Sequence, residues 1–143
     1  MIVEPQTLHR HTYVPGECMR ILVIDDDPIL REFATVYLSS PTTTLDTAHD
    51  GETGLERLSK EEFDLVLCDL DMPGMGGLDV IAAVRANDAL RALPIIVVTS
   101  NEDVVSIDRA YAAGATSFVT KPLNWRLLSY QIRFVHRAHL AIA

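Results

Sequence analysis

Acidic side chains follow two of the short apolar runs in this chain, at the points where those runs end. Asp25 and Asp26 directly follow the run 21–24, and Asp69 directly follows the run 65–68. Carboxylates that lie close together repel one another unless a cation compensates their charge. Oxygen ligands without histidine or cysteine select a hard ion. If the two run ends meet, the residues therefore predict a site for Mg²⁺ or Mn²⁺.

A hydroxyl and a lysine end two later runs. Thr99 follows the run 95–98, and Lys121 follows the segment 115–120. A carboxylate, a hydroxyl and a lysine beside Mg²⁺ are the components of a phosphoryl-transfer site. In such a site Asp69 is the nucleophile that forms an acyl phosphate. Lys121 is a point charge on the phosphoryl oxygens, and Thr99 donates a hydrogen bond to them.

Several neighbouring residues have simpler interpretations. Asp27 precedes Pro28, so we expect a helix N-cap rather than a metal ligand. The side chain of Asp71 is expected to be a turn residue before Pro73. Cys68 is expected to be a small buried residue rather than a reactive thiol. The histidines have no ligand spacing with cysteines, so no zinc site is predicted.

Strand-length and helix-length segments alternate from Met19 onward. Strands are predicted at 21–24, 43–48, 65–68, 95–98 and 115–120, and helices at 28–38, 51–59, 78–86, 102–113 and 123–141. Alternation of this kind predicts an α/β fold with helices on both faces of a parallel sheet. The simplest arrangement is a five-stranded, doubly wound sheet of order 2-1-3-4-5, which is flavodoxin-like. Its ligands bind outside the carboxyl ends of the strands.

Length and charge limit the classes of partner. The 143 residues suit one domain, and twelve Lys and Arg against twenty Asp and Glu give a net charge of −8. This charge argues against nucleic acid and against an anionic membrane surface as partners. No signal peptide or membrane span is recognisable, so a cytoplasmic protein is expected. Residues 1–18 show no clear period and are either an ordered arm or a segment upstream of a start at Met19, and the domain is predicted over 19–143.

Four stretches together resemble a known family. MRILVIDDDP, FDLVLCDLDMPGMGG, LPIIVVTS and GATSFVTKPL, in this order and spacing, resemble the receiver domain of two-component response regulators over about residues 19–143. The resemblance implies that Asp25 and Asp26 hold Mg²⁺ directly and through water. It also implies that Asp69 accepts a phosphoryl group from a histidine kinase or a phosphotransfer protein.

The same resemblance assigns roles around Asp69. Asp71 lies where the family uses a backbone carbonyl as a metal ligand, Thr99 matches the switch hydroxyl, and Lys121 matches the phosphate-binding lysine. Phe118 matches the switch aromatic, which turns inward when Thr99 moves toward the phosphate. The carboxylate of Asp71 is a departure, because it adds negative charge beside the phosphoryl site and so affects the lifetime of the acyl phosphate.

The output is expected to be protein–protein contact rather than catalysis on a separate substrate. The chain ends after the last predicted helix, so a stand-alone receiver is expected, with an unknown downstream target. Apolar residues of 123–141 cover more than one stripe, which predicts a partner. A homodimer through the fourth and fifth helices is one such prediction. KPLNW and RFVHR also resemble receivers that are fused to diguanylate cyclases.

Two other functions fit parts of the pattern. Asp69-Leu70-Asp71 resembles the DxD loop of haloacid-dehalogenase-type phosphatases, which also form an aspartyl phosphate with Mg²⁺. That motif normally follows the first strand of the core, whereas here an earlier strand already ends in an acidic pair. A receiver that acts as a fixed interaction module is the other alternative, and the complete set of acidic, hydroxyl and lysine residues argues against it.

Overall fold

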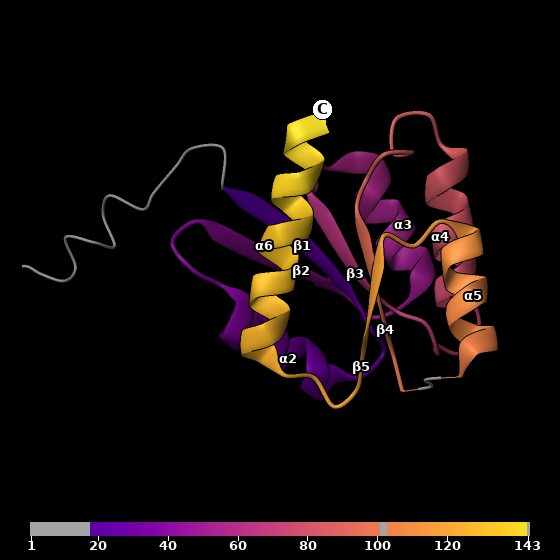
Figure 1. Ribbon diagram of the computed structural model, residues 1–143, viewed down its shortest axis with the longest axis horizontal. Helices are drawn as coiled ribbons and strands as arrows, with labels where there is room; N and C mark the ends of the chain where they lie inside the picture. Colours follow the sequence, from indigo (N-terminus) through magenta and orange to yellow (C-terminus); the bar gives the residue numbers. More distant parts are fainter. Residues whose placement is uncertain (1–17, 101–102, 143) are drawn as a thin grey trace, which may run out of the picture.

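The computed structural model describes residues 18–100 and 103–142. Its strands are β1 (Met19–Ile24), β2 (Thr43–Ala48), β3 (Leu65–Asp69), β4 (Ile95–Thr99) and β5 (Ser117–Thr120). Its helices are α2 (Pro28–Leu38), α3 (Gly51–Lys60), α4 (Gly77–Ala86), α5 (Val104–Ala113) and α6 (Trp125–Ile142) (Figure 1). The segment 1–18, apart from Cys18, lies outside the described residues, and the domain boundary at residue 19 stays a prediction.

The five strands form one parallel sheet of order β2-β1-β3-β4-β5, which confirms the predicted topology. Ile24 is in register with Cys68, so β1 and β3 end side by side. Asp69 in turn is in register with Val98. The residues that follow β1, β3 and β4 therefore meet at one edge of the sheet, as the sequence predicted.

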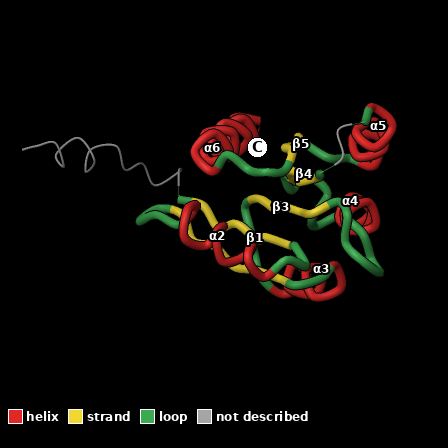
Figure 2. Tube along the Cα trace, turned by 90° about the horizontal axis from the view of Figure 1, so that it is seen from below, coloured by secondary structure: helices red, strands yellow, loops and turns green. Residues whose placement is uncertain are grey.

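Two apolar clusters cover the two faces of the sheet. One joins the sheet to α3, α4 and α5, through residues such as Leu58, Val80 and Ala110. The other joins it to α2 and α6, through residues such as Ala34 and Leu128. Figure 2 shows helices on both sides of the strands. This burial on both faces explains why β1, β3 and β4 are continuous apolar runs rather than alternating ones.

The predicted element ends differ from the observed ones near the C-terminus. β5 begins at Ser117 rather than at residue 115, because the N–H of Ala115 donates to the carbonyl of Ala110 and so belongs to the end of α5. α6 begins at Trp125 rather than at residue 123. The carboxamide of Asn124 accepts a hydrogen bond from the N–H of Leu127 and caps this helix. In 18–100 and 103–142 no helix combines the length and the apolar character that a membrane span needs.

The start of α4 lies against the end of β3. A Cβ atom on Gly77 would lie 2.6 Å from the carbonyl oxygen of Asp69 and 2.7 Å from the Cα of Leu70. These are backbone atoms, which cannot rotate away as a side chain does. On Gly76, by contrast, an added Cβ would meet its nearest atom at an ordinary 3.5 Å. Close approach of α4 to the strand that ends in Asp69 therefore requires glycine at 77.

We predict that Gly77→Ala lowers the free energy of unfolding by about 1–3 kcal/mol, the range found for overpacked sites. The clash exceeds the gain of up to about 1 kcal/mol that alanine brings to a helix. Gly76→Ser is the matched control, because its Cβ makes only ordinary van der Waals contacts and its hydroxyl can cap the helix. Urea unfolding of both variants measures the effect. Equal stability of Gly77→Ala and the native chain would show that the contact relaxes without cost.

Candidate functional site

Three carboxylates lie together at the carboxyl edge of the sheet. Asp25 directly follows β1, Asp26 is the next residue, and Asp69 is the last residue of β3. One carboxylate oxygen from each lies within 4.8 Å of the others. Asp25 and Asp69 are only 1% and 3% exposed, whereas Asp26 is exposed. The structure thus brings together the acidic residues that the sequence placed at the ends of two separate runs.

The two buried carboxylates are held in the same way. The N–H of Asp27 donates to Oδ1 of Asp25 at 2.8 Å, and the N–H of Asp71 donates to Oδ1 of Asp69 at 3.1 Å. Each is a side chain that accepts from the backbone two residues further on, as Asx turns do. One oxygen of each carboxylate is thereby fixed, and Oδ2 is left to face the site.

Lys121 is the cation that faces these oxygens. Its Nζ lies 3.5 Å from Oδ2 of Asp25 and 3.6 Å from Oδ2 of Asp69. Its backbone N–H donates to the carbonyl of Thr99 at 2.9 Å, which ties the end of β5 to the end of β4. The Lys121 side chain is 28% exposed, so its ammonium lies at the border of the site and stays accessible to solvent.

Burial and charge shift the titration of these groups. Burial, with a further contribution from the charges of Asp25 and Asp26, raises the pKa of Asp69 to about 6 against the opposing effects of the Asp71 N–H and Lys121. Burial likewise raises the pKa of Asp25. Burial opposes the charge on Lys121, but the two carboxylates beside it more than offset this and raise its pKa. The three carboxylates of the site therefore carry more negative charge than the Lys121 ammonium neutralises.

This excess charge fits a divalent cation. Oδ2 of Asp25 is buried and accepts no hydrogen bond, which is costly for a carboxylate oxygen unless a ligand occupies that position. The three carboxylates offer only oxygen atoms as ligands, which are the ligands that Mg²⁺ and Mn²⁺ prefer. Asp25, Asp26 and Asp69 are the residues in position to hold such an ion.

Thr99 and Asp71 make a contact that the sequence analysis missed. The hydroxyl of Thr99 donates to Oδ2 of Asp71 at 3.1 Å, and Thr99 is 1% exposed. The sequence analysis interpreted the Asp71 side chain as a turn residue and, from the family resemblance, as added negative charge beside the site, and its carboxylate does face the site. The N–H of Leu70 donates to the carbonyl of Val98, so the two strands continue side by side to this point. The predicted sheet order already placed β3 beside β4. That pairing of strand ends could have predicted the contact.

The remaining predicted residues lie around this centre. Asp27 is confirmed as the N-cap of α2, since its carboxylate accepts from the N–H of Ile29 at 2.9 Å. Cys68 is buried, and burial raises the pKa of its thiol. Phe118 lies half-buried on β5 and meets the ring of Tyr111 edge-on, with centroids 6.1 Å apart. Neither Cys68 nor Phe118 is in the carboxylate cluster.

The chain is similar to proteins of known role. A family model for the response regulator receiver domain matches residues 21–133. The chemotaxis protein CheY of Pseudomonas aeruginosa is 36% identical over 115 residues, which cover 80% of this chain and 93% of that protein. The DNA-binding response regulator MtrA of Mycolicibacterium smegmatis is 36% identical over 114 residues, which cover 80% of this chain but 49% of MtrA.

Solved structures agree with this family. The chemotaxis protein CheY4 of Vibrio cholerae superposes with a TM-score of 0.78 at 28% identity, over 82% of this chain and 98% of that one. A CheY-like receiver domain protein of Methanospirillum hungatei gives a TM-score of 0.81 at 24% identity, over 87% and 98% of the two chains, and supports the fold alone. Because the family model spans most of its length and the identity to CheY covers nearly all of that protein, this chain belongs to the response regulator receiver domain family.

Proposed function

We propose that Asp69 accepts a phosphoryl group from a histidine kinase or a histidine phosphotransfer protein. The observation that carries the proposal is the buried carboxylate of Asp69, with Oδ2 3.6 Å from Lys121 and an oxygen within 4.8 Å of those of Asp25 and Asp26. A carboxylate oxygen of Asp69 attacks the phosphorus of the phosphohistidine. The new bond is the acyl phosphate P–O bond, the P–N bond breaks, and the imidazole takes up a proton.

The other groups of the site stabilise the transferred phosphoryl group. Asp25, Asp26 and Asp69, with the backbone carbonyl of Asp71, hold Mg²⁺, for which Mn²⁺ can substitute. The bound ion supplies positive charge against the phosphoryl oxygens as negative charge develops on them. Lys121 supplies a second positive charge, 3.6 Å from Oδ2 of Asp69. The chain phosphorylates and dephosphorylates its own side chain and has no separate substrate.

The phosphoryl group changes contacts with partner proteins. Thr99 is the hydroxyl that moves toward the phosphoryl oxygens, and Phe118 is the aromatic ring that follows it inward. The half-buried position of Phe118 on β5 supports this role, because the ring has room to change its exposure. The change acts on a downstream protein through α5 and α6, and dimerisation through the same two helices stays a prediction. A cytoplasmic location is part of this proposal.

The alternative of a haloacid-dehalogenase-like phosphatase has no observation in its favour. The Asp69-Leu70-Asp71 motif follows β3, and the acidic pair Asp25-Asp26 follows the neighbouring β1. The sheet order and the relatives are those of receivers.

Incubation with acetyl phosphate tests the proposed acceptor. We expect one phosphoryl adduct on the chain by intact-mass spectrometry, formed with Mg²⁺ and absent with EDTA. Asp69→Asn removes the nucleophile and is expected to abolish the adduct. Asp88→Asn serves as a control, because it removes an exposed carboxylate far from the site. An adduct that persists in Asp69→Asn would place the acceptor elsewhere.

Because the carboxylate of Asp69 is buried, we predict that removal of its negative charge stabilises the metal-free protein, and that the gain depends on pH. The pKa of Asp69 is raised from 3.8 to about 6, so the folded chain binds more protons than the unfolded chain between these values. Stability of the metal-free protein therefore falls as pH rises from 3.8 to 6, and the full cost, at most about 3 kcal/mol, is present above pH 6. We predict that Asp69→Asn raises the melting temperature in EDTA at neutral pH, and that this gain shrinks toward pH 4.

With Mg²⁺ we expect the native chain to melt at a higher temperature than Asp69→Asn. The ion compensates the charge at position 69 only where that residue is an ionised aspartate. Thermal unfolding with EDTA and with Mg²⁺ measures both effects, and Asp88→Asn is again the control. A native chain that is as stable in EDTA as Asp69→Asn at neutral pH would contradict the electrostatic argument.

The contact between Thr99 and Asp71 predicts a slower loss of phosphate in Asp71→Asn. The carboxylate of Asp71 competes with the phosphoryl oxygens for the Thr99 hydroxyl and repels them. Removal of the Asp71 charge is expected to stabilise the phosphorylated form by about 1 kcal/mol. This corresponds to about fivefold slower hydrolysis. Phosphate release after phosphorylation measures the rate, with Asp88→Asn as the charge-matched control. An unchanged rate would show that Asp71 does not act on the phosphoryl group.

A further inference from the structure

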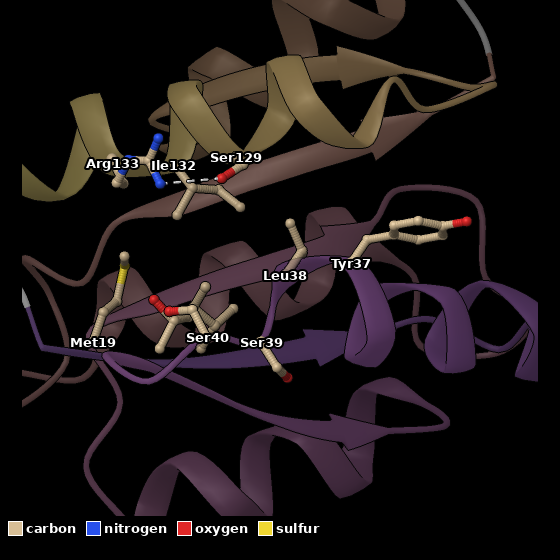
Figure 3. A pocket seen from close by; sticks show the side chains of 10 residues that line it. Met19, Tyr37, Leu38, Ser39, Ser40, Ser129, Ile132 and Arg133 are labelled. Atoms are coloured by element: carbon tan, nitrogen blue, oxygen red, sulfur yellow. Dashed lines mark hydrogen bonds between the residues drawn. The ribbon is translucent and has the colours of Figure 1, made fainter. Parts of the chain in front are cut away.

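A groove runs between α2 and α6, on the face of the sheet opposite α3, α4 and α5. Figure 3 shows its inner part, which has a volume of about 80 Å³ and reaches down to Met19 on β1. A second part of about 290 Å³ continues from it toward the start of α6. Tyr37, Ser129 and Arg133 line both parts, so the two form one α2–α6 groove. None of its lining residues belongs to the acceptor site.

Aromatic rings line the outer part of this groove. Tyr37 of α2 stacks on Trp125 of α6, with ring centroids 5.8 Å apart and planes 17° apart. Phe33 meets Tyr37 edge-on at 6.0 Å. Phe33, Tyr37 and Tyr130 are 48%, 58% and 54% exposed. Contiguous apolar surface of this kind marks an interaction site rather than a scattered exposed residue.

Two arginines on the wall of the groove make no ion pair with any acidic residue in the described part of the chain. Arg126 and Arg133 are exposed, and no carboxylate of the described chain lies within 4.0 Å of either guanidinium. Arg133 instead donates to the hydroxyl of Ser129 at 3.4 Å and lies over the ring of Tyr130 at 5.1 Å. The whole of α6 contains no acidic residue, although the chain has a net charge of −8. The groove is thus a basic region on an acidic protein.

We propose that the α2–α6 groove binds an acidic segment of a partner protein. An apolar or aromatic side chain of that segment lies on the Tyr37–Trp125 pair, and its carboxylates pair with Arg126 and Arg133. Guanidinium groups suit this task because they bind carboxylates with two parallel hydrogen bonds. Aromatic side chains and arginine are also the residues that contribute most to binding at protein interfaces.

The shape and the charge of the surface favour a protein segment over other anions. Exposed apolar side chains continue along α2 beyond the groove, where Val36 is 67% exposed, and a nucleotide in the groove would leave them uncovered. A lipid surface or a nucleic acid presents many negative charges at once, which the net charge of −8 repels. A single segment meets only the local basic region, because salt screens charges beyond about 10 Å.

Selection of peptides from a random-peptide phage library against the full chain tests the proposal. We expect the selected peptides to carry Asp or Glu beside an aromatic or leucine side chain. Trp125 is the only tryptophan of the chain, so its fluorescence reports binding of a synthesised selected peptide in the groove. The double variant Arg126→Glu/Arg133→Glu is expected to weaken binding by about tenfold or more, which corresponds to 1.4 kcal/mol.

Two matched controls separate this surface from other effects. Arg109→Glu reverses an exposed arginine on α5, away from the groove, and is expected to change affinity by less than about twofold, or 0.4 kcal/mol. Asp69→Asn is expected to bind equally well, so that failure of phosphorylation and failure of peptide binding are distinguishable. Circular dichroism checks that the double variant is folded, and Tyr37→Ala is a second variant that alters the groove without reversing charge.

Each of four results would overturn the proposal. These are a library that yields no binder, binders without acidic residues, equal affinity of the native chain and the double variant, and no loss of affinity in Tyr37→Ala. The same Trp125 titration with guanosine diphosphate and with vesicles of anionic phospholipid tests the other anions. A response to either of these that depends on the arginines, with none to acidic peptides, would assign the groove to a nucleotide or to a membrane instead.

Discussion

Repulsion between carboxylates at the carboxyl edge of the sheet is the constraint on which the site depends. Asp25, Asp26 and Asp69 lie within a few ångströms of one another, and among the described residues Lys121 is the cation whose ammonium lies within 4.0 Å of the carboxylates of Asp25 and Asp69. Such an arrangement exists only where a stronger framework enforces it. Here the framework is the apolar sheet, whose strands β1 and β3 are buried on both faces and end in register. The apolar core thus holds together a negatively charged edge that fits a divalent cation.

Backbone hydrogen bonds decide which oxygens of the buried carboxylates face the site. In both Asp25 and Asp69 the backbone N–H two residues further on takes Oδ1, and Oδ2 faces Lys121. Asp26, by contrast, is exposed to solvent. The same Asx geometry at the ends of neighbouring strands therefore sets two fixed, buried carboxylates beside one exposed carboxylate.

The sequence was most informative where one local pattern determines the structure. Continuous apolar runs predicted the central strands, and the polar residues after them predicted the contents of one sheet edge. It was least informative where contacts depend on how elements pack. The hydrogen bond from Thr99 to Asp71 requires the stagger of β3 against β4, and the start of β5 depends on how α5 ends at Ala115. The stacking of Tyr37 on Trp125 requires the packing of α2 against α6, which no local pattern specifies.

The competition for the Thr99 hydroxyl links the charged edge to the rest of the molecule. Without a phosphoryl group the hydroxyl donates to Asp71, and this bond holds it on the side of β3. In the proposed function, a dianionic phosphoryl group on Asp69 would be a stronger acceptor and would draw the hydroxyl away, while the loss at Asp71 would reduce the net gain. The difference between two such hydrogen bonds is on the order of 1 kcal/mol, which changes a population ratio about fivefold. A switch with so small a bias would be sensitive to one neighbouring charge, so we expect the carboxylate of Asp71 to affect how completely phosphorylation shifts this protein.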